Sequence, residues 1–192
     1  DQFVVQGERL IESGFVPNIW PYPPNLLPFC VVLGSMPLQT ATAVLAAMNA
    51  VLLIGASALL ANIVVVGAQS RFRWFCIHLV VMSLLEAAAL TIVVGQTAII
   101  VYFGAALALW GLTWNRALFV AIGVSLLMMK PQIGLLLTPL LLFAGPVAVR
   151  GLMGGAALSA VFAAPAFFVS MSTATDWLDQ IMRYDSVGPA NA

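Results

Sequence analysis

Long apolar runs, separated by short breaks of Gly, Pro and single charges, make up most of this chain. A transmembrane helix needs about 20 predominantly apolar residues to cross roughly 30 Å of hydrocarbon. The pattern therefore predicts an all-α fold, a polytopic membrane helix bundle with about six transmembrane helices. The predicted spans are residues 38–66, 74–94, 97–114, 117–130, 131–148 and 151–171.

Three further segments are predicted to be helical without crossing the membrane. Residues 25–36 lie between two prolines and would form a helix only about 18 Å long, so we expect a re-entrant helix. Residues 2–13 and 175–185 place apolar side chains on one helical face and charges elsewhere. This pattern is typical of interfacial amphipathic helices, and a solvated loop helix is the alternative.

Composition agrees with a membrane protein, because 62% of the 192 residues are hydrophobic and only 7% are charged. A soluble domain carries about a quarter charged residues. The net charge is zero, which argues against a nucleic-acid partner. Cys30 and Cys76 lie in apolar runs, so we expect neither a disulfide nor a metal site. We expect a single transmembrane domain over 1–192 that belongs to a longer protein.

Basic residues predict the orientation of this domain. Four of them fall in predicted connections that alternate along the chain: Arg71, Arg73, Arg116 and Arg150. Six crossings would place all four on one side, which the positive-inside rule makes cytoplasmic. The loop at residues 1–24 and the segment 172–192 would then be extracytoplasmic and flank the helix bundle at 25–171.

Lys130 and Glu86 are the two formal charges within the apolar runs. A charge at mid-bilayer costs about 2.5–3.5 kcal/mol on the lenient scale. Lys130 lies near a helix end, so it could snorkel as an anchor or bind a lipid phosphate at the outer leaflet. The following Pro131 favours the second interpretation, because proline frees backbone groups. Glu86 lies near mid-span and would be a functional or paired group, or simply protonated.

The remaining polar residues point to helix packing more than to chemistry. Asn49, Asn62 and Gln96 are predicted to form hydrogen bonds between helices, and His78 to be an interfacial residue rather than a ligand. Gly151 and Gly155 form a small-xxx-small pair that is typical of packing. The sequence contains no Walker loop, H-E-x-x-H, G-x-S-x-G or dinucleotide fingerprint. Any catalysis must depend on scattered groups gathered at the membrane surface.

Motifs on the predicted outer side resemble those of a known family. Tyr22-Pro23-Pro24 opens the short helix that ends at Pro37, Gly95-Gln96 follows, and Lys130-Pro131-Gln132 precedes a Leu-rich span. This order resembles glycosyltransferase family 87, the bacterial polyprenyl-phosphate-mannose-dependent mannosyltransferases with the GT-C membrane fold. Asp1-Gln2-Phe3-Val4 is similar to the family's D-x-x-V-like loop. One departure is that Thr97-Ala98 follows Gly95-Gln96, whereas the family often has G-Q-x-N.

The resemblance implies a GT-C-like bundle in the bacterial cytoplasmic membrane with an extracytoplasmic active site. Asp1 would be the catalytic base, and Tyr22, Gln96 and Lys130 would bind substrate, with Lys130 beside the donor phosphate. The protein would move a sugar, mannose in this family, from a polyprenyl-phosphate donor to a hydroxyl of a glycan or glycolipid acceptor, inverting the anomeric centre. No metal or other cofactor is expected. A transporter or lipid flippase, or a non-catalytic membrane subunit, is the alternative.

Overall fold

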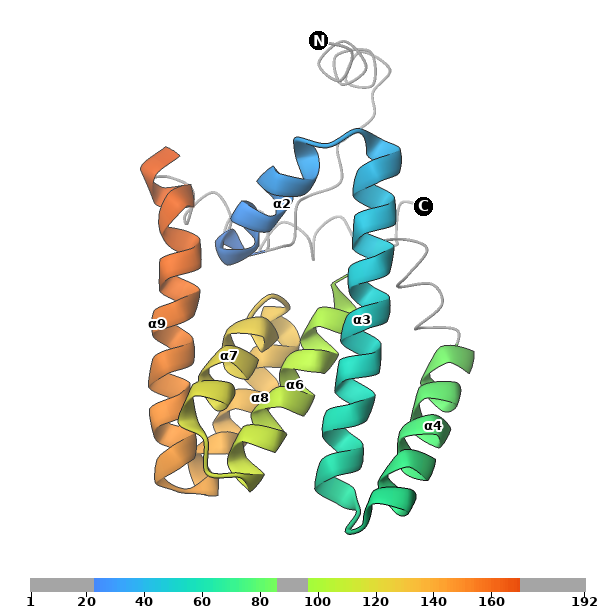
Figure 1. Ribbon diagram of the computed structural model, residues 1–192. Coiled ribbons are helices and arrows are strands. Elements are labelled where there is room, and N and C mark those ends of the chain that lie inside the picture. The colour runs from blue at the N-terminus through green and yellow to red at the C-terminus, as the bar shows by residue number, and fades with distance from the viewer. Residues whose placement is uncertain (1–22, 86–96, 170–192) are drawn as a thin grey trace, which may run out of the picture.

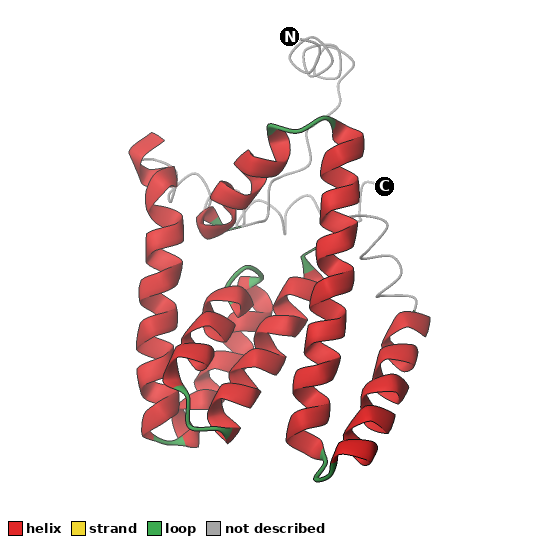
Figure 2. Ribbon diagram, in the orientation of Figure 1, coloured by secondary structure: helices red, strands yellow, loops and turns green. Residues whose placement is uncertain are grey.

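The computed structural model describes residues 23–85 and 97–169, and every regular element in these ranges is a helix (Figure 2). In chain order they are η1 (Pro24–Leu26), α2 (Leu27–Gly34), α3 (Leu38–Val64), α4 (Ala68–Leu84), α6 (Ala98–Thr113), α7 (Ala117–Leu127), α8 (Pro131–Leu141), η2 (Leu142–Ala144) and α9 (Pro146–Val169). The all-α class predicted from the sequence is confirmed for these residues.

Two long helices frame the bundle. Figure 1 shows α3 and α9 on opposite sides, the shorter α6, α7 and α8 between them, and α4 beside α3. The short α2 lies obliquely above α6 and α7 and contacts both α3 and α9. Its position and its length of eight residues agree with the short helix predicted at 25–36.

Sharp turns end the helices where the sequence supplies residues that tolerate a positive φ. Gly67 (φ 106°) separates α3 from α4, and Gly145 (φ 96°) precedes α9. Glycine adopts such angles without steric cost because it lacks Cβ. Asn115 (φ 56°) occupies the same region between α6 and α7, and Asn is among the non-glycine residues most often found there.

The number of membrane crossings is not confirmed as predicted. Two helices in the described ranges, Leu38–Val64 and Pro146–Pro165, are long and apolar enough to cross a membrane. The helices predicted as spans at 117–130 and 131–148 are shorter than expected. Each has only 11 residues, or about 16 Å, because Lys130-Pro131 and then Gly145-Pro146 interrupt the apolar run.

The start of α4 also differs from the prediction. The helix begins at Ala68 rather than at residue 74, so Arg71 and Arg73 lie within its first two turns and not in a connection. Arg71 is held there because its Nε donates to Val65 O (3.0 Å) and its Nη1 to Asn62 Oδ1 (3.4 Å). The predicted amphipathic helices at 2–13 and 175–185 lie outside the described residues.

Small residues bring α6, α7 and α9 into close contact. A Cβ added to Gly104 would lie 2.8 Å from Gly123 O, and one added to Gly155 would lie 2.6 Å from Val124 Cβ. Gly151 packs against Val120, which is fully buried. The predicted role of the Gly151/Gly155 pair in packing is confirmed, as expected where backbones approach without large side chains between them.

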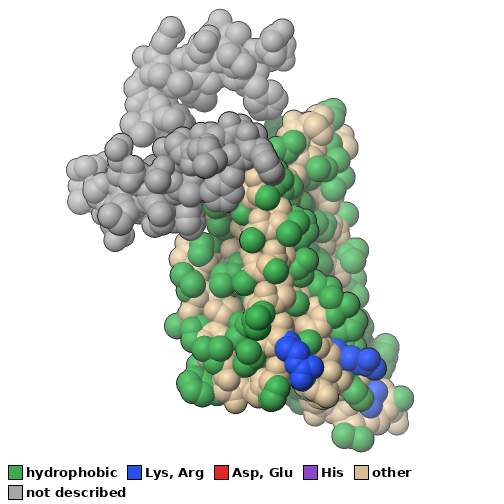
Figure 3. Space-filling view, turned by 90° about the vertical axis from the view of Figure 1, so that its left-hand side faces the viewer, with side chains coloured by type: hydrophobic (Ala, Val, Ile, Leu, Met, Phe, Trp, Pro, Cys, Tyr) green, Lys and Arg blue, Asp and Glu red, His purple; other side chains and the backbone are tan. Residues whose placement is uncertain are grey.

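The outer surface of the bundle is apolar. Large hydrophobic side chains point outward from every side, including Val51, Leu136, Phe143 and Val161, and Phe143 is 88% exposed. Figure 3 shows hydrophobic atoms spread along the full height of one face. Water would penalise such a surface, whereas lipid tails would not. The protein is therefore a membrane protein.

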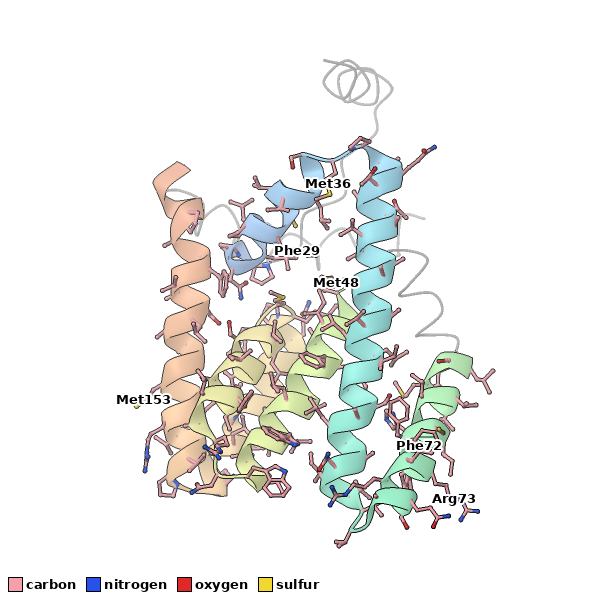
Figure 4. The ribbon with its side chains drawn as sticks, in the orientation of Figure 1. Phe29, Met36, Met48, Phe72, Arg73 and Met153 are labelled. Atoms are coloured by element: carbon pink, nitrogen blue, oxygen red, sulfur yellow. The ribbon has the colours of Figure 1, made fainter. Side chains whose placement is uncertain are left out.

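The four described arginines gather at one end of the bundle. Figure 3 shows basic side chains clustered near the lower end, and Figure 4 labels Arg73 there, at the start of α4. Arg116 and Arg150 belong to the same end, because the starts of α7 and α9 pack together through Gly151 and Ala117. We call this end, with Arg71, Arg73, Arg116 and Arg150, the arginine end.

Thiol labelling can determine which side of the membrane the arginine end faces. In a variant lacking Cys30 and Cys76, we expect Arg116→Cys to resist a membrane-impermeant reagent added outside intact cells, by the positive-inside rule. Gln39→Cys, an exposed position at the opposite end of α3, is the matched control and should be labelled. The reverse pattern would invert the proposed topology.

Candidate functional site

Lys130 lies between α7 and α8, at the end of the bundle opposite the arginines. Its backbone N–H donates to Leu127 O (3.1 Å), and its carbonyl accepts from Ile133 N and Gly134 N (both 2.9 Å). Pro131 occupies the first position of α8, where its missing N–H leaves no unsatisfied donor. The half-buried side chain is thus carried by a closely bonded turn. We call this end, with Lys130 and the start of α6, the lysine end.

The packing of α6 on α7 places Lys130 and Thr97 at the same end of the bundle. The helices are antiparallel (Figure 1), and Gly104 of α6 meets Gly123 of α7. Thr97 directly precedes α6, and Lys130 closely follows the end of α7. Both residues therefore lie at the lysine end.

The packing of α3 on α6 brings Asn49 near the start of α6. A Cβ on Gly55 would lie 3.0 Å from Phe103 Cε2, and both helices run in the same direction in Figure 1. Asn49 lies six residues before Gly55 in α3, and Thr97 lies six residues before Phe103 at the start of α6. Met48, the preceding residue of α3, is labelled beside the first turn of α6 in Figure 4.

Three buried polar side chains of this part of the bundle lack hydrogen-bond partners among the described residues. They are Asn25 (Oδ1), Asn49 (both amide atoms) and Thr97 (Oγ1). The exposed fraction of Asn49 is 0%. Asn25 belongs to η1, which packs against α9. Buried polar groups in proteins are usually hydrogen-bonded, so these unpaired atoms require an explanation.

The predicted hydrogen bonds between helices are found for one of the two asparagines concerned, Asn49 and Asn62. Asn62 accepts from Arg71 of α4, as expected. Asn49 makes no such bond within residues 23–85 and 97–169, and that prediction is wrong for these ranges.

His78 of α4 joins three helices, and its predicted place at the membrane interface stays a prediction. Its Nδ1 lies 2.9 Å from Ser57 Oγ on α3, and its Nε2 lies 2.6 Å from the hydroxyl of Tyr102 on α6. Ser57 donates its own proton to Leu53 O (2.8 Å), so it accepts from Nδ1–H and Tyr102 donates to Nε2. Both ring nitrogens of His78 are therefore hydrogen-bonded, which indicates a structural role in holding α4 against α3 and α6.

The described part of the site can bind charge and hydroxyl groups but holds no acid. All seven Asp and Glu residues lie outside residues 23–85 and 97–169. Within those ranges, no group of three or more His, Cys, Asp or Glu side chains could hold a metal ion. Lys130 offers three donors, and the amide and hydroxyl groups offer both donors and acceptors.

Of the four site residues predicted from the sequence, the structure describes Lys130. Asp1, Tyr22 and Gln96 lie outside the described residues, so their predicted convergence with Lys130 stays a prediction. Sequence reasoning missed Asn25 and Thr97. Each directly follows a motif that was singled out, Tyr22-Pro23-Pro24 and Gly95-Gln96, and that adjacency was the available signal.

Comparison with known proteins identifies the family of this protein. The sequence model of glycosyltransferase family 87 matches residues 20–191. The chain belongs to glycosyltransferase family 87. Family 87 membership confirms the resemblance drawn from the motifs, and together with the apolar helices it makes the protein a membrane glycosyltransferase rather than a transporter. The match includes Tyr22, Gln96 and Lys130. No curated protein and no solved structure matches the chain.

Proposed function

We propose that this family 87 transferase moves mannose from a polyprenyl-phosphate donor to a hydroxyl of a glycan or glycolipid acceptor. The observation that carries the proposal is Lys130, a cation on a closely bonded turn between α7 and α8, at the end of the bundle opposite the arginine end (Figure 1). A phosphate that joins a lipid tail to a sugar sits at the membrane boundary, where such a cation can meet it. No cofactor is part of this proposal.

The chemistry is a single displacement at the sugar. The acceptor oxygen forms a bond to the anomeric carbon as the bond from that carbon to the phosphate oxygen breaks, which inverts the centre. Asp1 takes the proton of the acceptor hydroxyl as general base. Lys130 stabilises the negative charge of the departing polyprenyl phosphate, and Tyr22 and Gln96 bind substrate. The roles of Asp1, Tyr22 and Gln96 rest on their motifs alone.

The lysine end is proposed to face the outside of a bacterial cytoplasmic membrane. Support comes from the arginine end, since basic residues concentrate on the cytoplasmic side. The polyprenyl-phosphate sugar would then approach through the outer leaflet, and the acceptor would approach from the extracytoplasmic space. Membrane lipids would surround the apolar flanks of the bundle.

Replacing Lys130 tests the phosphate assignment. In the full-length enzyme, we expect Lys130→Ala to weaken binding of polyprenyl phosphate by about 10- to 100-fold, the range of one hydrogen bond to a charged group. Lys130→Arg should recover part of the affinity, because it keeps the charge but changes its shape. Donor binding and sugar transfer are measured separately.

Arg150→Ala is the matched control, because Arg150 is an exposed cation at the arginine end. Its loss should leave both the donor affinity and the transfer rate unchanged. An unchanged affinity for polyprenyl phosphate in Lys130→Ala would reduce Lys130 to a membrane anchor and remove the observation on which the proposal depends.

A further inference from the structure

Asn49 is the first fully buried residue of α3 counted from the lysine end. The buried positions of this helix are Asn49, Leu53, Ala56, Ser57 and Ala61. They recur at helical spacing and form one buried stripe along α3. Asn49 therefore lies on the buried face of α3, near the point where α6 begins.

Both amide atoms of Asn49 are buried without a partner among the described residues, and so is the hydroxyl oxygen of Thr97. In a membrane protein such atoms are especially unfavourable, because no bulk water is at hand to replace the missing bonds. An apolar residue at position 49 would pack at this buried position without that cost. The amide thus reduces stability, and a binding role would account for its presence.

The chemistry of the two side chains selects the kind of ligand. An amide and a hydroxyl each offer a donor and an acceptor, which matches the hydroxyl groups of a sugar. A phosphate offers only acceptors and fits Lys130 instead. Asn49, Thr97 and Lys130 lie toward the same end of the bundle, and α6, which begins after Thr97, packs against both α3 and α7.

We propose that Asn49 and Thr97 form the subsite that holds the sugar of the lipid-linked donor, while Lys130 holds its phosphate. This inference rests on the proposed function and adds to it the residues that recognise the sugar. Asn49 and Thr97 act as positioning residues: they orient the pyranose ring by its hydroxyl groups and leave the anomeric carbon to the acceptor.

The test compares two ligands, polyprenyl phosphate and polyprenyl-phosphate-mannose, on the full-length enzyme. The ratio of their dissociation constants measures what the sugar adds to binding. We expect Asn49→Leu, nearly the same size, to reduce that ratio by about 10-fold per lost hydrogen bond while the affinity for polyprenyl phosphate stays unchanged. Thr97→Val, which removes only the hydroxyl, should reduce the ratio in the same way.

Thermal unfolding distinguishes a binding role of Asn49 from a structural one. Asn49→Leu should raise the melting temperature by about 2–4 °C, since two unpaired buried polar atoms are removed. Asn62→Leu is the control on the same helix. Because Asn62 bonds to Arg71, its loss should lower the melting temperature and leave both dissociation constants unchanged.

The outcomes separate the two proposals. If wild-type enzyme binds both ligands equally, the donor assignment fails and the sugar subsite fails with it. If the wild type prefers the mannosyl ligand and Asn49→Leu keeps that preference, only the subsite is wrong, and Asn49 holds water or nothing. A lower melting temperature in Asn49→Leu would also overturn the inference, because the amide would then have a structural partner.

Discussion

Asp1→Asn in the full-length enzyme is expected to lower the rate of sugar transfer by about 10²–10⁴-fold, the usual contribution of a general base. The amide cannot take the proton of the acceptor hydroxyl. Donor binding should persist, because the phosphate and the sugar are assigned to other residues. The measurement is transfer of radiolabelled mannose from polyprenyl-phosphate-mannose, with donor affinity determined in parallel.

The distribution of acids sharpens this experiment. Residues 23–85 and 97–169 contain none, so the carboxylates of this sequence that could act as the base are those in residues 1–22 and 170–192 and Glu86. Glu12→Gln is the matched control within the same predicted loop and should retain activity. Full transfer activity in Asp1→Asn would exclude Asp1 as the general base. Loss of transfer in a folded Glu86→Gln protein would indicate Glu86 as the base instead.

Gly123→Ala is expected to destabilise the bundle by about 1–3 kcal/mol. The added Cβ would lie 2.5 Å from Gly104 O and 2.7 Å from Ala108 N. Both neighbours are backbone atoms of α6, so α6 and α7 must separate instead of a side chain rotating away. For a protein of this size the melting temperature falls by about 2–4 °C per kcal/mol, which thermal unfolding in detergent would detect.

Gly34→Ala is the control for that substitution. Gly34 ends α2, and a Cβ added there would meet no atom within 4 Å. The same change in intrinsic helix propensity then occurs without a packing conflict, so its melting temperature should not fall. Equal effects of the two substitutions would show that the α6/α7 contact is looser than its glycines indicate.

Helix positions were predicted best where the sequence contains clear stops. The span predicted at 38–66 is α3, Leu38–Val64, bounded by Pro37 and Gly67, and the span at 97–114 is α6, Ala98–Thr113. Prediction was weaker at α4, because Arg71 and Arg73 were taken as loop residues. The hydrogen bonds of Arg71 to the end of α3 depend on the turn at Gly67, which hydropathy does not detect.

The candidate site was predictable only in part. Lys130 stood out from the sequence because a charge within an apolar run requires an explanation. Which helices pack together at the lysine end cannot be read from hydrophobic periodicity. Asn49 was therefore assigned to helix bonding, whereas its amide has no hydrogen-bond partner among the described residues.

The short lengths of α7 and α8 have a consequence for how the enzyme is made. A helix of 11 residues covers only about half of the hydrocarbon thickness, so neither is a stable span during insertion. The pair should enter as a hairpin and settle only when α6 and α9 close around the glycine contacts. Because Lys130 lies in that hairpin's turn, the proposed phosphate site would form last, and a newly inserted chain would stay inactive until its helices have assembled.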